Sequence, residues 1–99
     1  MNNFNQVINS EVPVLVDFYA EWCAPCKMMP PILKQVKDHF GDRIRIIKID
    51  TDQNPVISHQ YQIRSIPTMM LFKKGEKAWQ TSGVMAAGQL ISTLTYYIN

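Results

Sequence analysis

The pattern of hydrophobic and polar positions along the chain predicts four strands and about four helices. A nearly continuous apolar run from Pro13 to Tyr19 favours a central strand covered on both faces, and the β-branched segment Ile44 to Ile49 predicts a second strand. Thr68 to Phe72 and Ala78 to Ser82 predict two more strands, because Lys73-Lys74-Gly75-Glu76 between them has the composition of a hairpin turn.

Apolar residues at helical spacing mark most of the remaining chain. Asn3 is a candidate N-cap for a short helix that ends near Ser10, and Asn54-Pro55 predicts the N-cap and first residue of another that runs to about Gln60. A C-terminal helix is expected from the apolar positions Leu90, Ile91, Leu94, Tyr97 and Ile98, and the segment before it, Met85 to Gly88, offers no good N-cap.

The longest helix is expected from Pro25 to about Phe40. Its apolar face consists of Met29, Ile32, Leu33, Val36 and Phe40, with polar residues opposite. Pro30 and Pro31 fall inside this segment, where a missing amide and a ring clash bend or break a helix. We therefore expect a kink at the two prolines.

The order of these elements indicates the fold class. Helices alternate with strands in the first half of the chain, and the second half holds a hairpin and a final helix. This order is typical of an α/β fold with a mixed sheet and helices on both faces. The length of 99 residues suits one domain, so we expect residues 1–99 to form a single domain.

Composition and charge exclude several classes of protein. The chain is 46% hydrophobic and 18% charged with a net charge of +2, which is ordinary for a globular protein and gives no nucleic-acid signature. Uncharged apolar runs are too short to span a membrane, and Met1 to Pro13 lacks the basic and apolar regions of a signal peptide. We expect a soluble, cytoplasmic protein that binds neither nucleic acid nor membranes.

The candidate chemistry lies in two cysteines where the first strand passes into the longest helix. Cys23 and Cys26 are the only cysteines in the chain. A thiol at the start of a helix lies beside unpaired N–H groups and the positive end of the helix dipole, and both stabilise a thiolate. Cys23 is the candidate nucleophile, and Cys26, one turn further on, is the candidate resolving thiol that attacks a mixed disulfide on Cys23.

Three segments together resemble the thioredoxin family: Asp17 to Lys27 with its Trp22-Cys23-Ala24-Pro25-Cys26, then Ile49 to Pro55, then Ile63 to Thr68 with its Ile66-Pro67-Thr68. The similarity extends from about Phe4 to the C-terminus. It implies the thioredoxin fold and a protein-disulfide reductase in electron transport and cell redox homeostasis, with a redox-active Cys23–Cys26 disulfide. It further implies disulfide-containing partner proteins, electrons from NADPH through a thioredoxin reductase, no bound cofactor or metal, and a monomer.

The resemblance gives roles to two charged residues in apolar surroundings. Asp17 matches an aspartate buried beneath the disulfide, which helps to move the proton of Cys26, and burial raises the pKa of a carboxyl group toward neutrality. Lys48 matches a buried lysine that tempers this shift. The alternatives are a structural, hydrogen-bonded Asp17 and an exposed edge-strand Lys48.

The resemblance also predicts a docking surface. Pro67 matches the family's cis-proline, which faces the disulfide and leaves the neighbouring backbone free to pair with a substrate strand. A mostly apolar patch around it is expected to dock partner proteins, and it consists of Trp22, Ala24, Pro25, Ile66, Gly83 and Val84. For Gly83 the alternative is a plain bulge glycine.

The chain departs from the family pattern in two ways. Ala24 stands where most thioredoxins have glycine, so the redox potential does not follow from the resemblance. The family's first strand is missing, because a helix from about residue 3 leaves no length for it. The segment Ile44 to Ile49 then becomes a sheet edge blunted by Arg43, Arg45 and Lys48, through which dimerisation stays open.

Other functions fit the residues less well. A closed zinc site needs four ligands, and only His39 and His59 accompany the cysteines. A purely structural disulfide that closes so short a loop gains only about 2 kcal/mol. A disulfide oxidase or isomerase of the same fold is the nearest alternative and normally works in an oxidising compartment, and a redox-independent binding or holdase subunit is the alternative from another class.

Overall fold

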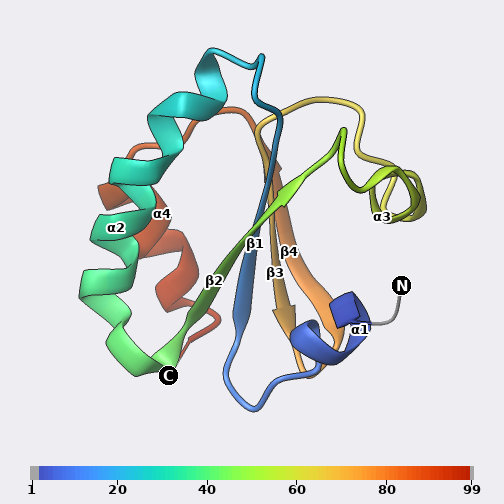
Figure 1. Cartoon of the computed structure of the whole chain (residues 1–99). Coiled ribbons are helices and arrows are strands. Elements are labelled where there is room, and N and C mark those ends of the chain that lie inside the picture. Colours follow the sequence, from blue (N-terminus) through green and yellow to red (C-terminus); the bar gives the residue numbers. More distant parts are fainter. Residues whose placement is uncertain (1–2, 99) are drawn as a thin grey trace.

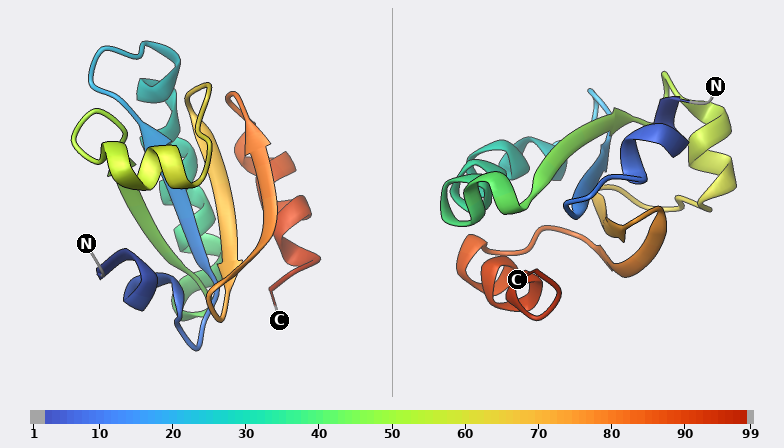
Figure 2. Two further views of the ribbon diagram at one scale, coloured as in Figure 1. Left: turned by 90° about the vertical axis from the view of Figure 1, so that its right-hand side faces the viewer. Right: turned by 90° about the horizontal axis from the view of Figure 1, so that it is seen from below.

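The computed structural model describes residues 3–98 and arranges them in three layers around one sheet (Figures 1 and 2). The helices are α1 (Asn3–Ile8), α2 (Met29–Phe40), α3 (Pro55–Gln60) and α4 (Ala87–Thr95), with 3-10 turns η1 (Pro25–Met28) and η2 (Gly41–Arg43). The strands are β1 (Val14–Tyr19), β2 (Arg45–Asp50), β3 (Thr68–Lys73) and β4 (Glu76–Ser82). Helices α2 and α4 cover one face of the sheet, and α1 and α3 cover the other (Figure 1).

The sheet has four strands in the order β2-β1-β3-β4. Strand β1 runs parallel to β2 and antiparallel to β3, and β3 pairs antiparallel with β4. The predicted α/β class, with a mixed four-stranded sheet and helices on both faces, is confirmed. Strand β1 is buried on both faces up to Phe18, as its continuous apolar run requires, and β2 lies at one border of the described sheet (Figure 2).

The expected kink at Pro30 and Pro31 is wrong in its position. The chain first makes the 3-10 turn η1, and α2 begins afterwards at Met29, so both prolines lie in the first turn of the α-helix. The N–H groups of a first turn have no partner within the helix, so a proline there sacrifices no hydrogen bond. The break in the helix therefore precedes the prolines and lies between η1, which contains Cys26, and α2.

The hairpin between β3 and β4 is tighter than predicted. Its loop consists of Lys74 and Gly75, with φ values of 53° and 88°, as in the two-residue turns that match the twist of antiparallel strands. Both strands accordingly extend further into the loop than expected, to Lys73 and from Glu76. The Gly75 N–H donates to the Ile8 carbonyl at 3.0 Å, which attaches the turn to the end of α1.

Two predicted helix starts differ in detail. Asn54 precedes α3 as expected, but its side chain does not cap the helix and instead donates to the Asp50 carbonyl oxygen at 2.9 Å. Helix α4 starts at Ala87 without a side-chain cap, as predicted for Met85 to Gly88. The prediction that α4 continues through Ile98 is wrong, because the regular helix ends at Thr95.

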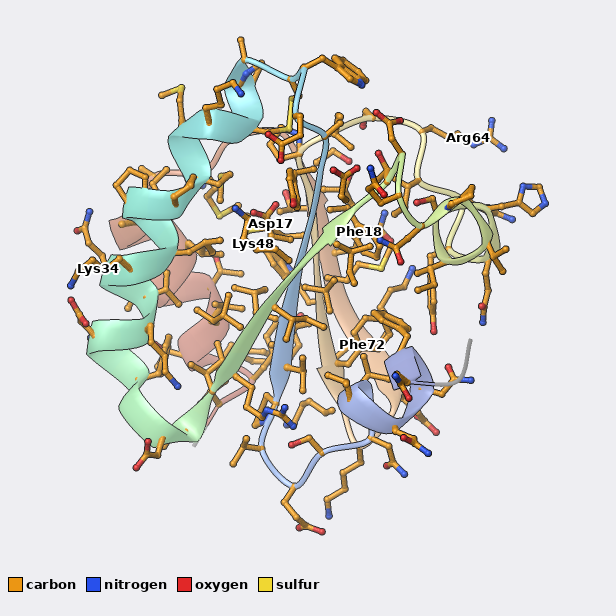
Figure 3. All side chains as sticks on the ribbon, viewed as in Figure 1. Asp17, Phe18, Lys34, Lys48, Arg64 and Phe72 are labelled. Atoms are coloured by element: carbon orange, nitrogen blue, oxygen red, sulfur yellow. A yellow bond between two sulfur atoms is a disulfide. The ribbon has the colours of Figure 1, made fainter. Side chains whose placement is uncertain are left out.

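Two hydrophobic clusters fill the spaces between the layers. The larger lies between the sheet and α2 with α4 and includes Leu15, and the smaller lies on the side of α1 and α3 and includes Val16 and Phe18. Because successive strand residues point to opposite faces, Asp17 lies on the same face of the sheet as Leu15. This is the face that α2 covers (Figure 3). A carboxyl group is thus placed inside the larger apolar layer.

Candidate active site

Cys23 and Cys26 form a disulfide at the point where the chain leaves β1 and enters η1, with a Cα–Cα distance of 5.3 Å. Both side chains are buried and form a small cluster with Ala20, against which Ile66 packs. The bond joins a loop residue to the first turn after the strand. The two predicted redox residues and the predicted Ile66 loop therefore lie together.

The surroundings of the Cys23 sulfur suit a thiolate. It accepts the Cys26 N–H at 3.2 Å, and it lies 3.8 Å from the Ile66 carbonyl oxygen. The Cys26 amide belongs to η1, where the N–H groups of a helix start point outward. A donor aimed at a sulfur favours the thiolate over the neutral thiol.

The segment before β3 lies beside the disulfide. Its Ile66–Pro67 peptide bond is cis, and the Thr68 hydroxyl donates to the Ser65 carbonyl at 2.6 Å. The Gly83 N–H donates to the Pro67 carbonyl at 2.8 Å, which holds the segment after β4 against this loop. Pro67 itself is buried, so Ile66, which is half-buried, is the member of the pair left for a partner.

Most of the residues predicted to form a docking patch are exposed. Trp22 is 72% exposed, and Ala24, Pro25 and Val84 are exposed too, while Gly83 is half-buried. The Trp22 ring is held in place because its Nε1–H donates to a carboxylate oxygen of Asp52 at 2.8 Å.

Asp17 lies fully buried, and neither carboxylate oxygen has a hydrogen-bond partner within the described chain. Burial raises the pKa of Asp17 to about 6, and the positive charge of Lys48 partly opposes this shift. The hydrogen bonds that a structural role would use are therefore absent from residues 3–98. The carboxyl group changes its charge close to neutral pH, as an acid–base group must.

Lys48 is exposed, so the expectation of a buried lysine is wrong. It lies directly opposite Asp17 in the pairing of β2 with β1, and its ammonium group is 4.6 Å from the centre of the Tyr19 ring. A strand at the sheet edge leaves the long side chain in solvent, yet close enough to act on Asp17 (Figure 3). Lys48 is thus an edge-strand lysine that still lowers the pKa of Asp17.

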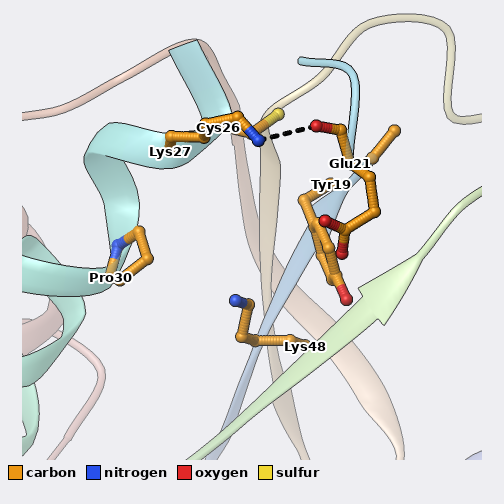
Figure 4. A pocket seen from close by; sticks show the side chains of 7 residues that line it. Tyr19, Glu21, Cys26, Lys27, Pro30 and Lys48 are labelled. Atoms are coloured by element: carbon orange, nitrogen blue, oxygen red, sulfur yellow. Dashed lines mark hydrogen bonds between the residues drawn. The ribbon is translucent and has the colours of Figure 1, made fainter. Parts of the chain in front are cut away.

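A pocket opens beside Cys26 (Figure 4). Its lining consists of Tyr19, Ala20, Glu21, Cys26, Lys27, Pro30 and Lys48. The Lys27 ammonium donates to the Glu21 carbonyl at 2.7 Å and so bridges one side of the opening. The pocket gives solvent access to Cys26 from the side on which Lys48 lies.

Comparison with known proteins decides the family. The sequence model of the thioredoxin family matches residues 1–96. A thioredoxin-like protein from Synechocystis sp. is 50% identical over 97 residues, which cover 97% of this chain and 92% of that protein. Thioredoxin from Pyropia yezoensis is 46% identical (95% of this chain, 88% of the relative), and thioredoxin 1 from Synechococcus elongatus is 40% identical (94% and 87%). The chain belongs to the thioredoxin family.

Thioredoxins are thiol–disulfide oxidoreductases, and this member has the Cys23–Cys26 pair through which the family reduces disulfides. The family works through its own dithiol and binds no cofactor for this chemistry. In residues 3–98 there is no cluster of three or more potential metal ligands, and no helix there has the length and apolar character needed to cross a bilayer.

The structure adds residues that the sequence did not indicate as parts of a thioredoxin site. Asp52 anchors Trp22, and the Glu21 carbonyl accepts from Lys27. A signal for Asp52 was available, because the carboxyl ends of the parallel strands β1 and β2 meet at one edge of the sheet. The segment Asp50-Thr51-Asp52 after β2 must therefore lie near the segment that follows β1.

Proposed function

We propose that the two cysteines of this thioredoxin have separate roles in reducing partner disulfides. The Cys23 thiolate attacks a partner disulfide and forms a mixed disulfide, and one partner sulfur leaves as a thiolate that takes up a proton. Cys26 then attacks the Cys23 sulfur, releases the second partner sulfur and re-forms Cys23–Cys26, so two electrons pass to the partner. The observation that carries this assignment is the Cys26 N–H directed at the Cys23 sulfur.

Asp17 is proposed as the base for the second step. Cys26 must lose its proton to attack, and a carboxyl group with a pKa of about 6 is ionised at neutral pH and can accept it. No protein group in residues 3–98 donates a hydrogen bond to either oxygen, which supports this role. Lys48 tunes the pKa of Asp17 from across the strand pair.

The docking patch is proposed to hold an extended segment of the partner on either side of its cysteine. Main-chain pairing beside Pro67 would fix the segment, because the Ile66 carbonyl already lies next to the Cys23 sulfur. The patch residues Trp22, Ala24, Pro25, Ile66, Gly83 and Val84 would supply apolar contact around it. Selection among partners then depends on shape and apolar area more than on charge.

The cellular setting completes the proposal. Residues 1–99 act as one domain and as a monomer in the cytoplasm, where the dithiol takes electrons from NADPH through a thioredoxin reductase and serves cell redox homeostasis. This placement fits the chemistry, because the oxidised pair must be reduced again after each turnover and the cytosol keeps thiols reduced.

The test is the redox equilibrium of the Cys23–Cys26 couple against glutathione, followed by the fluorescence of Trp22. A potential at or below the cytosolic poise of about −220 to −260 mV supports a reductase role in the cytoplasm. A potential tens of millivolts above that poise would make the protein an oxidase or isomerase and would attribute the change to Ala24. Replacing both cysteines by serine serves as the control, because a redox-independent binding subunit keeps its function in that variant.

A further inference from the structure

The outer edge of β2 leaves main-chain groups without a partner strand among the described residues. The N–H groups of Arg45 and Thr51 donate to the carbonyls of Pro13 and Tyr19 at 2.9 and 2.8 Å, so alternate residues of β2 face β1. Ile46, Lys48 and Asp50 must then direct their N–H and C=O groups away from the sheet. In the part of the chain that is described, no strand lies beyond them.

Two side chains bound this unpaired stretch. At its start the Lys37 ammonium donates to the Ile44 carbonyl at 2.7 Å, and at its end the Asn54 amide donates to the Asp50 carbonyl at 2.9 Å. Between these contacts the N–H and C=O of Ile46 and Lys48 and the N–H of Asp50 have no partner in residues 3–98. We name this stretch the β2 window, and it has the length of a short added strand.

An apolar pocket lies on one side of the β2 window. Its lining consists of Asn3, Phe4, Val7, Ile47, Ile49, Asn54 and Ile57, from α1, β2 and the start of α3. A strand paired with β2 would point every second side chain to this face, next to Ile47 and Ile49. A single added strand could therefore pair with the main-chain groups of the β2 window and place its apolar side chains in the pocket.

The positive charge of Arg45 favours an acidic residue at one end of such a strand. Arg45 is exposed on the face of Ile47, and it takes part in no ion pair among the described residues. The carboxylate of Asp50 accepts the N–H groups of Asp52 and Gln53 at 2.9 and 3.3 Å and is therefore turned toward its own loop. The start of the edge carries an unpartnered positive charge.

We propose that the β2 window binds a short extended segment of a partner protein by adding a strand to the sheet. The segment carries bulky apolar side chains at alternate positions, which enter the pocket, and a carboxylate at the end that lies beside Arg45. Cysteine is not required in the segment, because main-chain pairing, apolar contact and one charge are sufficient for this mode of binding. This surface recruits a partner independently of disulfide exchange.

The experiment is an NMR titration of the oxidised, ¹⁵N-labelled protein with the cysteine-free peptide acetyl-Glu-Thr-Val-Thr-Val-Thr-Glu-amide. The two valines occupy alternate positions, and a glutamate at each end serves either strand direction. Saturable shifts are expected at the amides of Ile46, Lys48 and Asp50, with slower amide exchange there and no shift at Trp22. The same peptide with lysine for glutamate is expected to bind about fivefold more weakly.

A pair of variants at one position tests main-chain pairing. Ile46→Pro removes an N–H that faces away from β1, so the β1–β2 ladder stays intact, and peptide binding is expected to fall about tenfold. Ile46→Ala loses similar side-chain packing but keeps the N–H, and it is expected to bind as the wild type does. Disulfide reduction by both variants shows that they fold.

A second pair tests the charge without altering the backbone. Arg45→Glu is expected to weaken binding of the glutamate peptide and to strengthen binding of the lysine peptide, and Arg45→Gln should lie between. The proposal is overturned by an absence of saturable shifts up to millimolar peptide, by shifts centred on Trp22 and Ile66, or by equal binding to the two Ile46 variants. A dimer of the protein alone that Ile46→Pro dissociates would also overturn it, since the occupant would then be a second copy.

Discussion

At the scale of single residues, the two cysteines have different surroundings although both are buried. The Cys23 sulfur accepts a hydrogen bond from the Cys26 N–H and lies beside the Ile66 carbonyl, next to residues of the proposed docking patch. Cys26 instead lines a pocket that also includes Lys48. A partner sulfur is therefore expected to meet Cys23, while protons reach Cys26 through this pocket.

Trapping tests this difference directly. Cys26→Ser is expected to accumulate mixed disulfides with partner proteins through Cys23, because the thiol that resolves them is gone. Cys23→Ser is expected to trap little, since Cys26 lacks the amide donor. Mass spectrometry of the trapped adducts identifies the bonded cysteine, and trapping mainly through Cys26 would reverse the assignment.

Asp17 gives a prediction about pH. Asp17→Asn is expected to slow resolution of the mixed disulfide about tenfold or more above pH 6, where the wild-type carboxyl is ionised and acts as a base. Below pH 6 the two rates should converge, because the wild-type carboxyl is then protonated. Stopped-flow measurement of the pH–rate profile checks this, and equal rates at pH 8 would contradict the role.

A matched variant tests whether Lys48 tunes this step. Lys48→Gln removes the charge that lowers the pKa of Asp17, so the midpoint of the pH–rate profile is expected to move upward. The same profile measured for Lys34→Gln is the control, because Lys34 lies on α2 and pairs with Asp38. A midpoint that stays fixed in Lys48→Gln would leave Lys48 without a tuning role.

At the scale of elements, the position of Pro30 in the first turn of α2 has a measurable consequence. Pro30→Ala is expected to change the free energy of unfolding by less than about 1 kcal/mol, because no helical hydrogen bond is missing there. If the proline lay within a continuous helix from Pro25, its replacement would stabilise the protein by ~3 kcal/mol. Gln35→Pro, at an exposed interior position of α2, is the control and is expected to cost ~3 kcal/mol. Urea denaturation measures all three proteins.

The elements also show what could be predicted from the sequence. Cys23 and Cys26 stand where one periodicity ends and another begins, and the hairpin depends on Lys74-Gly75, so short-range patterns were sufficient for both. The contact of Trp22 with Asp52 spans 30 positions and depends on how β1 and β2 end, so no local pattern indicates it. The exposure of Lys48 follows from its place on the border strand, which is a property of the whole sheet.

At the scale of the whole molecule, the buried carboxyl of Asp17 couples the stability of the fold to pH. Its pKa rises from 3.8 to about 6 on folding, so the folded protein binds the proton more tightly than the unfolded chain does. The free energy of unfolding therefore falls as pH rises from about 4 to about 6. Above pH 6 the carboxylate is ionised in both states, and the folded protein bears the full loss of stability from burying its charge. A shift of about 2 units corresponds to ~3 kcal/mol.

Asp17→Asn separates the contribution of Asp17 to the pH dependence of stability from the contributions of the other titrating groups. The variant is expected to be more stable than the wild type by up to ~3 kcal/mol at pH 7.5, and the difference should shrink as pH falls and disappear only well below pH 3.8, where the wild-type carboxyl is protonated in both states. Denaturant unfolding of the oxidised proteins across this pH range provides the measurement. Equal stabilities at pH 7.5 would mean that the carboxylate is compensated in the fold. The expected gain implies that the wild-type protein retains a destabilising charge in its apolar core, which fits a group kept for proton transfer and not for folding.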